Sequence, residues 1–196
     1  MTTFVRYVVL GGFCALAFAG CRREPAPAQG PTPANDTEVK ALVDFQERVK
    51  VYVDLHKRIE GELPALGNEA TPKQLDDRQR ELGRRIASVR HDSVQGDLFT
   101  TAMEAMIRRH FATIFNAKDG QDIRGSVMDE NPVDLPVSVN ERYPDEVPLS
   151  TMPPEVLELL PKMPEELEYR FVSRHLVVVD AHAHMIVDFV QNAIPQ

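Results

Sequence analysis

The sequence predicts an α+β domain in which three N-terminal helices pack against a small C-terminal antiparallel β-meander. Two patterns support this prediction. Between residues 37 and 116 apolar side chains recur every three or four positions, which is typical of amphipathic helices. Between residues 167 and 190 apolar and polar side chains alternate, which is typical of strands with one face on a core. Residues 37–196 are enough for a single domain with one core.

The three helices are expected over residues 37–60, from Thr71 to about Arg90, and over residues 97–115. A capping box begins the second helix, because Thr71 can cap its first turn while Gln74 reaches back to the cap. The residues expected to face the core are Val39, Leu42, Val43, Val49, Tyr52, Val53 and Ile59 in the first helix, Leu75, Leu82, Ile86 and Val89 in the second, and Leu98, Phe99, Met103, Met106, Ile107, Phe111, Ile114 and Phe115 in the third.

The rest of the domain is expected to divide into an irregular, proline-containing loop over residues 117–152 and a β-rich part over residues 153–196 that opens with a helical turn. The apolar run from Leu176 to Val190 is too long for one strand, so a turn is expected near residues 181–183. Odd-numbered positions of this run are expected on the core. The even-numbered, polar positions are Asp180, His182, His184 and Asp188.

Charge argues against one class of partner. The chain has 22 Lys and Arg residues against 30 Asp and Glu residues, a formal net charge of −8. Binding to a phosphate backbone needs concentrated positive charge, so we expect no nucleic-acid partner. Arginines do cluster among acidic residues in the expected second helix, which indicates a solvated mixed-charge face, with an anionic partner or a lipid headgroup surface as the alternative. They are Arg78, Arg80, Arg84, Arg85 and Arg90.

The first 21 residues carry the pattern of an exported protein. Arg6 precedes an uncharged, mostly apolar run over residues 7–19, which is shorter than a membrane-spanning helix needs. The run ends in Ala19-Gly20-Cys21, which resembles the lipobox of bacterial lipoproteins. This resemblance implies a signal peptide over residues 1–20 and lipid attachment at Cys21.

Residues 21–36 are rich in Pro and Ala and are expected to form a tether between the lipid and the domain. The resemblance implies an exported chain that is anchored to the membrane by the lipid on Cys21, and Arg22 favours the outer membrane, facing the periplasm. Cys14 would leave with the signal peptide and acylation would occupy Cys21. No thiol would then be left for a disulfide, a metal or a nucleophile.

The strongest candidate for a chemical site is the motif Asp180-Ala-His182-Ala-His184. Two histidines two positions apart on a strand share a face, and with Asp180 they could bind zinc. The surrounding VVVDAHAH resembles the first metal-binding strand of the amidohydrolase barrel enzymes, although those enzymes continue through a whole barrel and only residues 185–196 follow here. The alternative is an ordinary polar turn or strand face without a cofactor. His56 and His110 are interpreted as buried, neutral, hydrogen-bonded imidazoles.

These observations favour a non-enzymatic binding, structural or assembly role in the cell envelope, with an envelope protein as partner. The expected interaction surface is the loop over residues 117–152, with Arg142 and Tyr143 as exposed contacts. The alternative is a zinc-binding protein or metal-dependent hydrolase that uses the Asp180, His182 and His184 cluster. The segments NERYP, PLSTMPPEVLELLPKMPEELEYRFV and IVDFV resemble the C-terminal part of uncharacterised exported bacterial proteins, which implies no activity.

Overall fold

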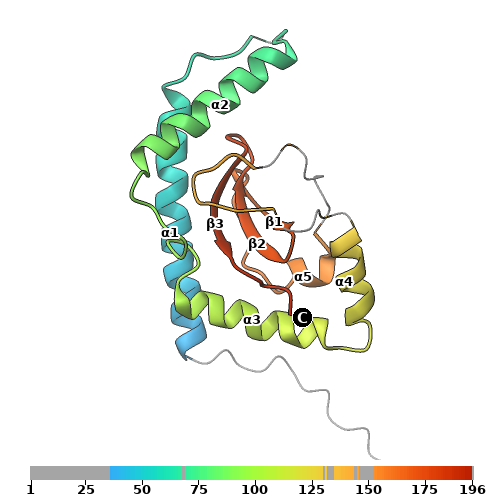
Figure 1. Cartoon of the computed structure of the whole chain (residues 1–196). Coiled ribbons are helices and arrows are strands. Elements are labelled where there is room, and N and C mark those ends of the chain that lie inside the picture. The colour runs from blue at the N-terminus through green and yellow to red at the C-terminus, as the bar shows by residue number, and fades with distance from the viewer. Residues whose placement is uncertain are drawn as a thin grey trace, which may run out of the picture. The chain divides into compact units, whose positions relative to one another are not determined.

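The computed structural model describes residues 36–195, except for residues 68, 130, 132–134, 144 and 146–151. In this part of the chain helices precede a three-stranded sheet, which confirms the predicted α+β class (Figure 1). The predicted signal peptide, Cys21 and the tether up to residue 35 lie outside the described residues. The elements are α1 (Asp36–Gly61), α2 (Pro72–Val89), α3 (Thr101–Phe115), α4 (Gly120–Asp129), α5 (Pro154–Leu157), β1 (Leu167–Val172), β2 (His175–Asp180) and β3 (Met185–Val190).

The strands form an antiparallel meander in the order β1-β2-β3, as the alternation of the sequence predicts. Residues 181–184 make the turn between β2 and β3, at the predicted place. Helix α1 contacts both α2 and α3 and runs alongside the sheet (Figure 1). No helix in the described part of the chain combines the length and apolar character that a bilayer span requires.

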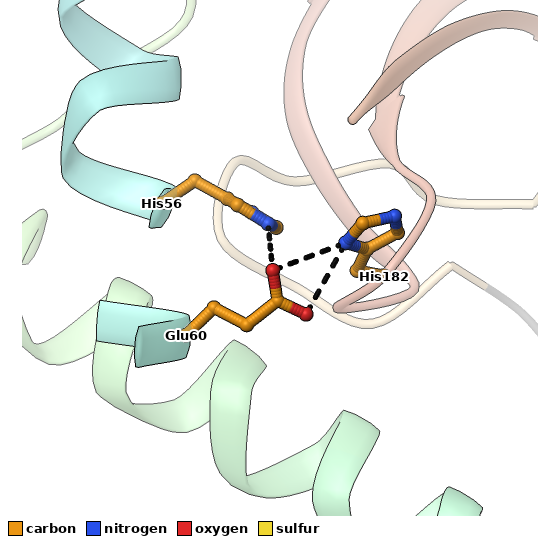
Figure 2. A group of neighbouring side chains, drawn as sticks. All are labelled: His56, Glu60 and His182. Carbon is orange, nitrogen blue, oxygen red and sulfur yellow. Dashed lines mark hydrogen bonds and ion pairs between the residues drawn. The ribbon is translucent and has the colours of Figure 1, made fainter. Parts of the chain in front are cut away.

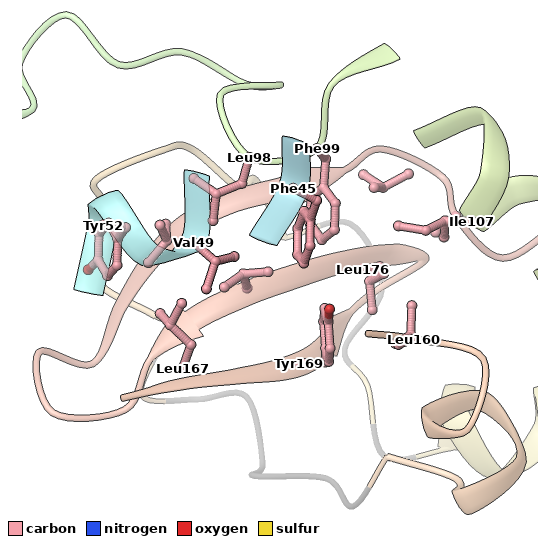
Figure 3. Packing of buried hydrophobic residues seen from close by; sticks show 14 of the residues in the cluster. Phe45, Val49, Tyr52, Leu98, Phe99, Ile107, Leu160, Leu167, Tyr169 and Leu176 are labelled. Carbon is pink, nitrogen blue, oxygen red and sulfur yellow. The ribbon is translucent and has the colours of Figure 1, made fainter. Parts of the chain in front are cut away.

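The main core lies between the sheet and the helices. Side chains from α1, including Phe45 and Val49, meet Phe99 and the inner face of the strands (Figure 3). The rings of Phe45 and Phe99 stack with their centroids 5.5 Å apart. Full burial of an aromatic or branched side chain of this size stabilises the fold by about 1.5–3 kcal/mol. The core therefore ties α1 to the segment that leads into α3.

Helix α1 buries a different stripe from the predicted one at its N-terminal end. Ala41 and Phe45 are buried, whereas Val39 and Val43 are 47% and 49% exposed. Both sets have helical spacing, so only the position of the packing partner distinguishes them. The predicted stripe of α2 is likewise correct only in its middle. There Leu82 and Ile86 are buried, and Leu75 and Val89 are each 54% exposed.

Helix α3 begins at Thr101, not at the predicted residue 97, because the preceding backbone folds around Asp188. The buried carboxylate of Asp188 accepts hydrogen bonds from the backbone N–H groups of Gly96, Leu98 and Phe99, at 2.9, 2.7 and 2.8 Å. Burial raises the pKa of Asp188, and these N–H groups oppose that shift. The segment is thereby fixed in a non-helical conformation.

A β-bulge changes which residues of β3 face the helices. Val178 pairs with Asp188 and Val179 with Ile186, so Val187 is an extra residue in β3. Val187 belongs to the main core, and its neighbour Asp188 also points to the helix side. The predicted alternation therefore holds for Met185 and Val187 and is wrong from Asp188 onward, where Val190 lies in the main core and Phe189 in the cluster on the other face. Asp180 and Asp188, expected on a polar face, are both fully buried.

The other face of the sheet is covered as well. Tyr143 is fully buried there, in a second cluster with Val177, Val179 and Ile186. The backbone N–H of Tyr143 donates to the carbonyl of His184 at 2.9 Å, which holds this segment beside β3. Two-sided burial explains why β2 reads as a nearly continuous apolar run.

The predicted irregular loop over residues 117–152 contains the regular helix α4, which corrects that expectation. Its first residue, Gly120, lies against the end of α3, where an added Cβ would stand 2.6 Å from the carbonyl oxygen of Ile114. Val127 is buried and Gly125 has open space around it. Because α4 has few apolar residues, its sequence lacks the three- and four-residue spacing from which a helix is predicted. The predicted helical turn within residues 153–160 is present as α5.

A candidate metal centre between α1 and the β2–β3 turn

Two histidines and a glutamate converge where α1 meets the β2–β3 turn (Figure 2). His56 Nε2 lies 3.2 Å from Glu60 Oε2. His182 Nδ1 lies 3.3 Å from the same oxygen. One ligand atom from each of the three residues lies within 4.8 Å of the other two. We call His56, Glu60 and His182 the candidate metal centre.

Local structure places each of these side chains. His56 and Glu60 are four residues apart on α1, so they share one face of the helix. His182 lies in the turn that follows β2, and the carboxylate of Asp180 shapes that turn. Asp180 Oδ1 accepts hydrogen bonds from the backbone N–H groups of His182 at 3.0 Å and Ala183 at 2.7 Å.

The second oxygen of Asp180 holds His56. Asp180 Oδ2 lies 2.6 Å from His56 Nδ1 and accepts a hydrogen bond from the Tyr52 hydroxyl, also at 2.6 Å. Asp180, His56 and Tyr52 are all buried. Histidines that bind metal usually donate their other ring N–H to a carboxylate, which fixes the ring and raises its basicity. His56 has this arrangement, with Nδ1 toward Asp180 and Nε2 toward Glu60.

The charges around His56 favour its protonated form. Burial alone would lower the pKa of His56, but the hydrogen bond and negative charge of Asp180, together with Glu60, outweigh burial and raise the pKa. With both ring nitrogens facing carboxylates, an imidazolium can donate to each of them. The pKa of Tyr52 is raised because its hydroxyl is buried and lies beside the Asp180 carboxylate.

The donor set and its spacing suit zinc. Two imidazole nitrogens and one carboxylate form a ligand set of known catalytic zinc sites, in which the fourth position stays open. In a tetrahedron with metal–ligand bonds of about 2.0–2.1 Å, the ligand atoms lie about 3.3 Å apart. The contacts of His56 and His182 with Glu60 Oε2, at 3.2 and 3.3 Å, already have this spacing. The two histidine nitrogens lie within 4.8 Å of each other, and binding of zinc would draw them to this spacing.

A hollow of ≈ 340 Å³ opens onto the centre. Glu60 and His182 line it, whereas His56 is fully buried. Ala181 of the β2–β3 turn also lines it, and the rest of the wall comes from α2 and the loop before it, including Leu66, Leu75, Asp76 and Arg78. A metal ion at the centre would therefore have its open position on the side of Glu60 and His182 that faces this hollow.

The predicted set of Asp180, His182 and His184 does not form one group. His182 joins the centre, and Asp180 supports it through His56. His184 lies elsewhere because residues 181–184 form a turn and not a strand face. Its Nε2 is 3.5 Å from Asp145 Oδ1 and its ring lies edge-on to Tyr143. Burial lowers the pKa of His184, and nearby Arg142 lowers it further.

The sequence interpretation missed Glu60 and assigned His56 only a structural role. His56 is buried and hydrogen-bonded as expected, but to carboxylates that raise its pKa. The available signal was the four-residue spacing from His56 to Glu60 on a helix that also carries Tyr52. His110 differs from its expectation. It is only half-buried, and its Nδ1 has no hydrogen-bond partner in the part of the chain that the structure describes.

Arg142 and Tyr143 are not the exposed contact pair that the sequence predicted. Tyr143 is fully buried against the outer face of the sheet. Arg142 is held by ion pairs with Asp76 and Asp145, at 3.2 and 3.0 Å. These contacts give both residues a role in attaching their segment to α2 and β3.

Comparison with known proteins adds no functional assignment. The chain matches no protein-family model, no curated protein and no solved structure. The geometry of the candidate metal centre and the sequence features of the N-terminus are therefore the only indications of function in the described residues and the sequence.

Proposed function

We propose that this protein binds a zinc ion through His56 Nε2, the Glu60 carboxylate and His182 Nδ1. The observation that supports this function is the convergence of three ligand atoms from two distant segments around one point, with His56 oriented by Asp180. A purely structural histidine needs only one satisfied hydrogen bond, whereas here two rings and two carboxylates meet. Zinc would replace the protons that hold His56 and His182 against Glu60.

The residues around the proposed zinc ion favour a zinc-binding protein over a zinc-dependent hydrolase. A zinc hydrolase needs a base near the metal-bound water in addition to the ligands. Among the described residues that line the hollow, the carboxylates are Glu60, which is a ligand, and Asp76. Asp76 is engaged by Arg80 at 2.7 Å and by Arg142 at 3.2 Å. The hydrogen bond from Arg80 lowers the pKa of Asp76, which makes it a poor base.

The test is calorimetric titration of the full chain with zinc. His182→Ala is the most informative variant, because the His182 side chain is 43% exposed and its removal leaves the core intact. Loss of an outer-shell partner alone weakens metal sites by about 10–100-fold, so loss of a ligand should cost at least that much. Glu60→Gln should behave in the same way.

His184→Ala is the matched control, since it removes a neighbouring histidine that lies outside the centre. We expect one zinc per chain, bound with unchanged affinity by the control. Absence of stoichiometric binding by the unmodified chain would refute the proposal, as would equal losses in His182→Ala and His184→Ala.

We also propose that the chain is a lipoprotein, exported and anchored to the outer membrane through Cys21, with the domain facing the periplasm. The apolar run over residues 7–19, the Ala19-Gly20-Cys21 motif and the Pro- and Ala-rich tether support this. Labelled palmitate should enter the wild-type chain and not Cys21→Ser. Equal labelling of both chains would refute lipidation at this residue. An envelope-protein partner stays a prediction without a defined surface, because Tyr143 is buried.

A further inference from the structure

The hollow beside the candidate metal centre has the features of a small-ligand site. We propose that the open position of the bound metal takes the carboxylate group of a small organic acid, and that Arg78 provides the second contact to that carboxylate. This inference rests on the zinc site proposed above. It adds the chemical class of the ligand and the residue that selects it.

Arg78 is placed to make this contact. It lines the hollow from α2, and its Nη2 stands 4.0 Å from Glu60 Oε1. Its Nη1 donates to the carbonyl of Pro64 at 2.5 Å, which holds the guanidinium in position. Among the described residues Nη2 donates no hydrogen bond, and a guanidinium has five N–H donors. Arg78 therefore offers a pre-positioned cation with donors to spare.

The charge at this end of the hollow favours an anion. A zinc ion with two neutral imidazoles and Glu60 retains one positive charge, and Arg78 adds another. Asp180 does not line the hollow, and its carboxylate is engaged by His56 Nδ1, the Tyr52 hydroxyl and the backbone N–H groups of the β2–β3 turn. The charge of Asp76 is already matched by Arg80 and Arg142. A carboxylate could bind the metal through one oxygen and accept from Arg78 with the other.

The walls indicate the size and character of the rest of the ligand. A volume of ≈ 340 Å³ is at the small end of the range for small-molecule sites, which is roughly 300–1,000 Å³. Leu66, Leu75 and Leu82 line it, and Leu75 is 54% exposed although it is a large apolar side chain. A short apolar body beside the carboxylate would cover the exposed surface of Leu75, whereas Leu82 is already buried. The volume and the leucine side chains of the hollow therefore suit a short, branched organic acid.

The probe is isovalerate, with isovaleramide as its neutral isostere, each titrated into the full chain saturated with zinc. Because the hydrogen bond from Arg78 is strengthened by the negative charge of the ligand, the acid should bind about tenfold or more tightly than the amide. Arg78→Gln should remove the part of this preference that Arg78 contributes and leave the part due to the metal, and Arg78→Lys should restore some of it, because lysine keeps the charge but not the planar fork.

Arg84→Gln is the charge-matched control. Arg84 lies on the same helix, pairs with Glu81 and does not line this hollow. It should keep the full preference for the acid. Equal affinity for acid and amide, or an equal loss in Arg78→Gln and Arg84→Gln, would overturn the inference. Tighter binding of inorganic phosphate than of isovalerate would overturn it too, since it would show a general anion site.

The two proposals fail in distinguishable ways. Because the ligand titrations use zinc-saturated protein, a change in zinc affinity does not enter the comparison. A chain that binds no zinc refutes the proposed function and this inference together. A chain that binds zinc normally but shows no preference for the acid refutes only the inference.

Discussion

The replacement Asp180→Asn separates the two roles of one buried carboxylate. Asp180 accepts hydrogen bonds from the Tyr52 hydroxyl, from His56 Nδ1 and from the backbone N–H groups of His182 and Ala183. Asparagine has almost the same shape, but one of its two terminal atoms is an NH₂ donor. If its oxygen serves the turn, its NH₂ group faces Tyr52 and His56, which are themselves donors.

The contacts that Asp180→Asn removes set the size of both effects. A buried donor left without an acceptor costs about 1–3 kcal/mol, so two cost about 2–6 kcal/mol. The Tyr52 hydroxyl can rotate and accept a hydrogen bond from the asparagine NH₂ group. The loss of stability in Asp180→Asn is therefore expected near the lower end of this range. The loss of the carboxylate behind His56 should also weaken zinc binding by about 10–100-fold, which corresponds to about 1.4–2.8 kcal/mol.

Asp188→Asn is the matched control. The Asp188 carboxylate is also fully buried and accepts four backbone N–H groups, but it contacts none of the three proposed ligands. Urea unfolding with a chelator present measures stability, and zinc calorimetry measures affinity. Both variants should be less stable, and only Asp180→Asn should bind zinc more weakly. Equal zinc affinity in all three proteins, or an equal decrease in both variants, would refute the role assigned to Asp180.

Three further predictions concern stability and need only urea unfolding. Gly120→Ala should destabilise the domain by about 1–3 kcal/mol, because its Cβ would overlap the backbone at the end of α3. Gly125→Ala, with open space around it in the same helix, should stabilise by up to about 1 kcal/mol, and equal effects would contradict the packing argument. Thr71→Ala should cost about 1 kcal/mol through removal of the capping box, and a change near zero would show that the cap does not matter. Burial raises the pKa of Tyr143 from 10.0 to about 12, so stability should be complete below pH 10 and fall as pH rises toward 12. Tyr143→Phe should remove part of that fall, and an identical pH profile would contradict it.

The features that could be predicted from the sequence are those with local causes. The Thr71 capping box is present because its donors and acceptors lie within three residues of one another. The turn near residues 181–183 is present because a strand of that length rarely continues unbroken. The buried stripe of α1, the bulge opposite Val178 and helix α4 were not predictable in this way. Each of these features depends on which surface packs against the segment. The apolar residues of the sequence fit more than one such packing equally well.

The candidate metal centre also has one part with a local cause and one part that depends on packing. By itself the sequence determined that His56 and Glu60 share a helix face and that Asp180 and His182 lie close together around a turn, because neighbours along the chain are constrained by backbone geometry. Only the tertiary structure decided that these two pairs meet, although Glu60 and His182 are 122 positions apart. A single hydrogen bond contributes about 1 kcal/mol, which is too little to choose such a contact. The burial of the whole core between α1 and the sheet made that choice.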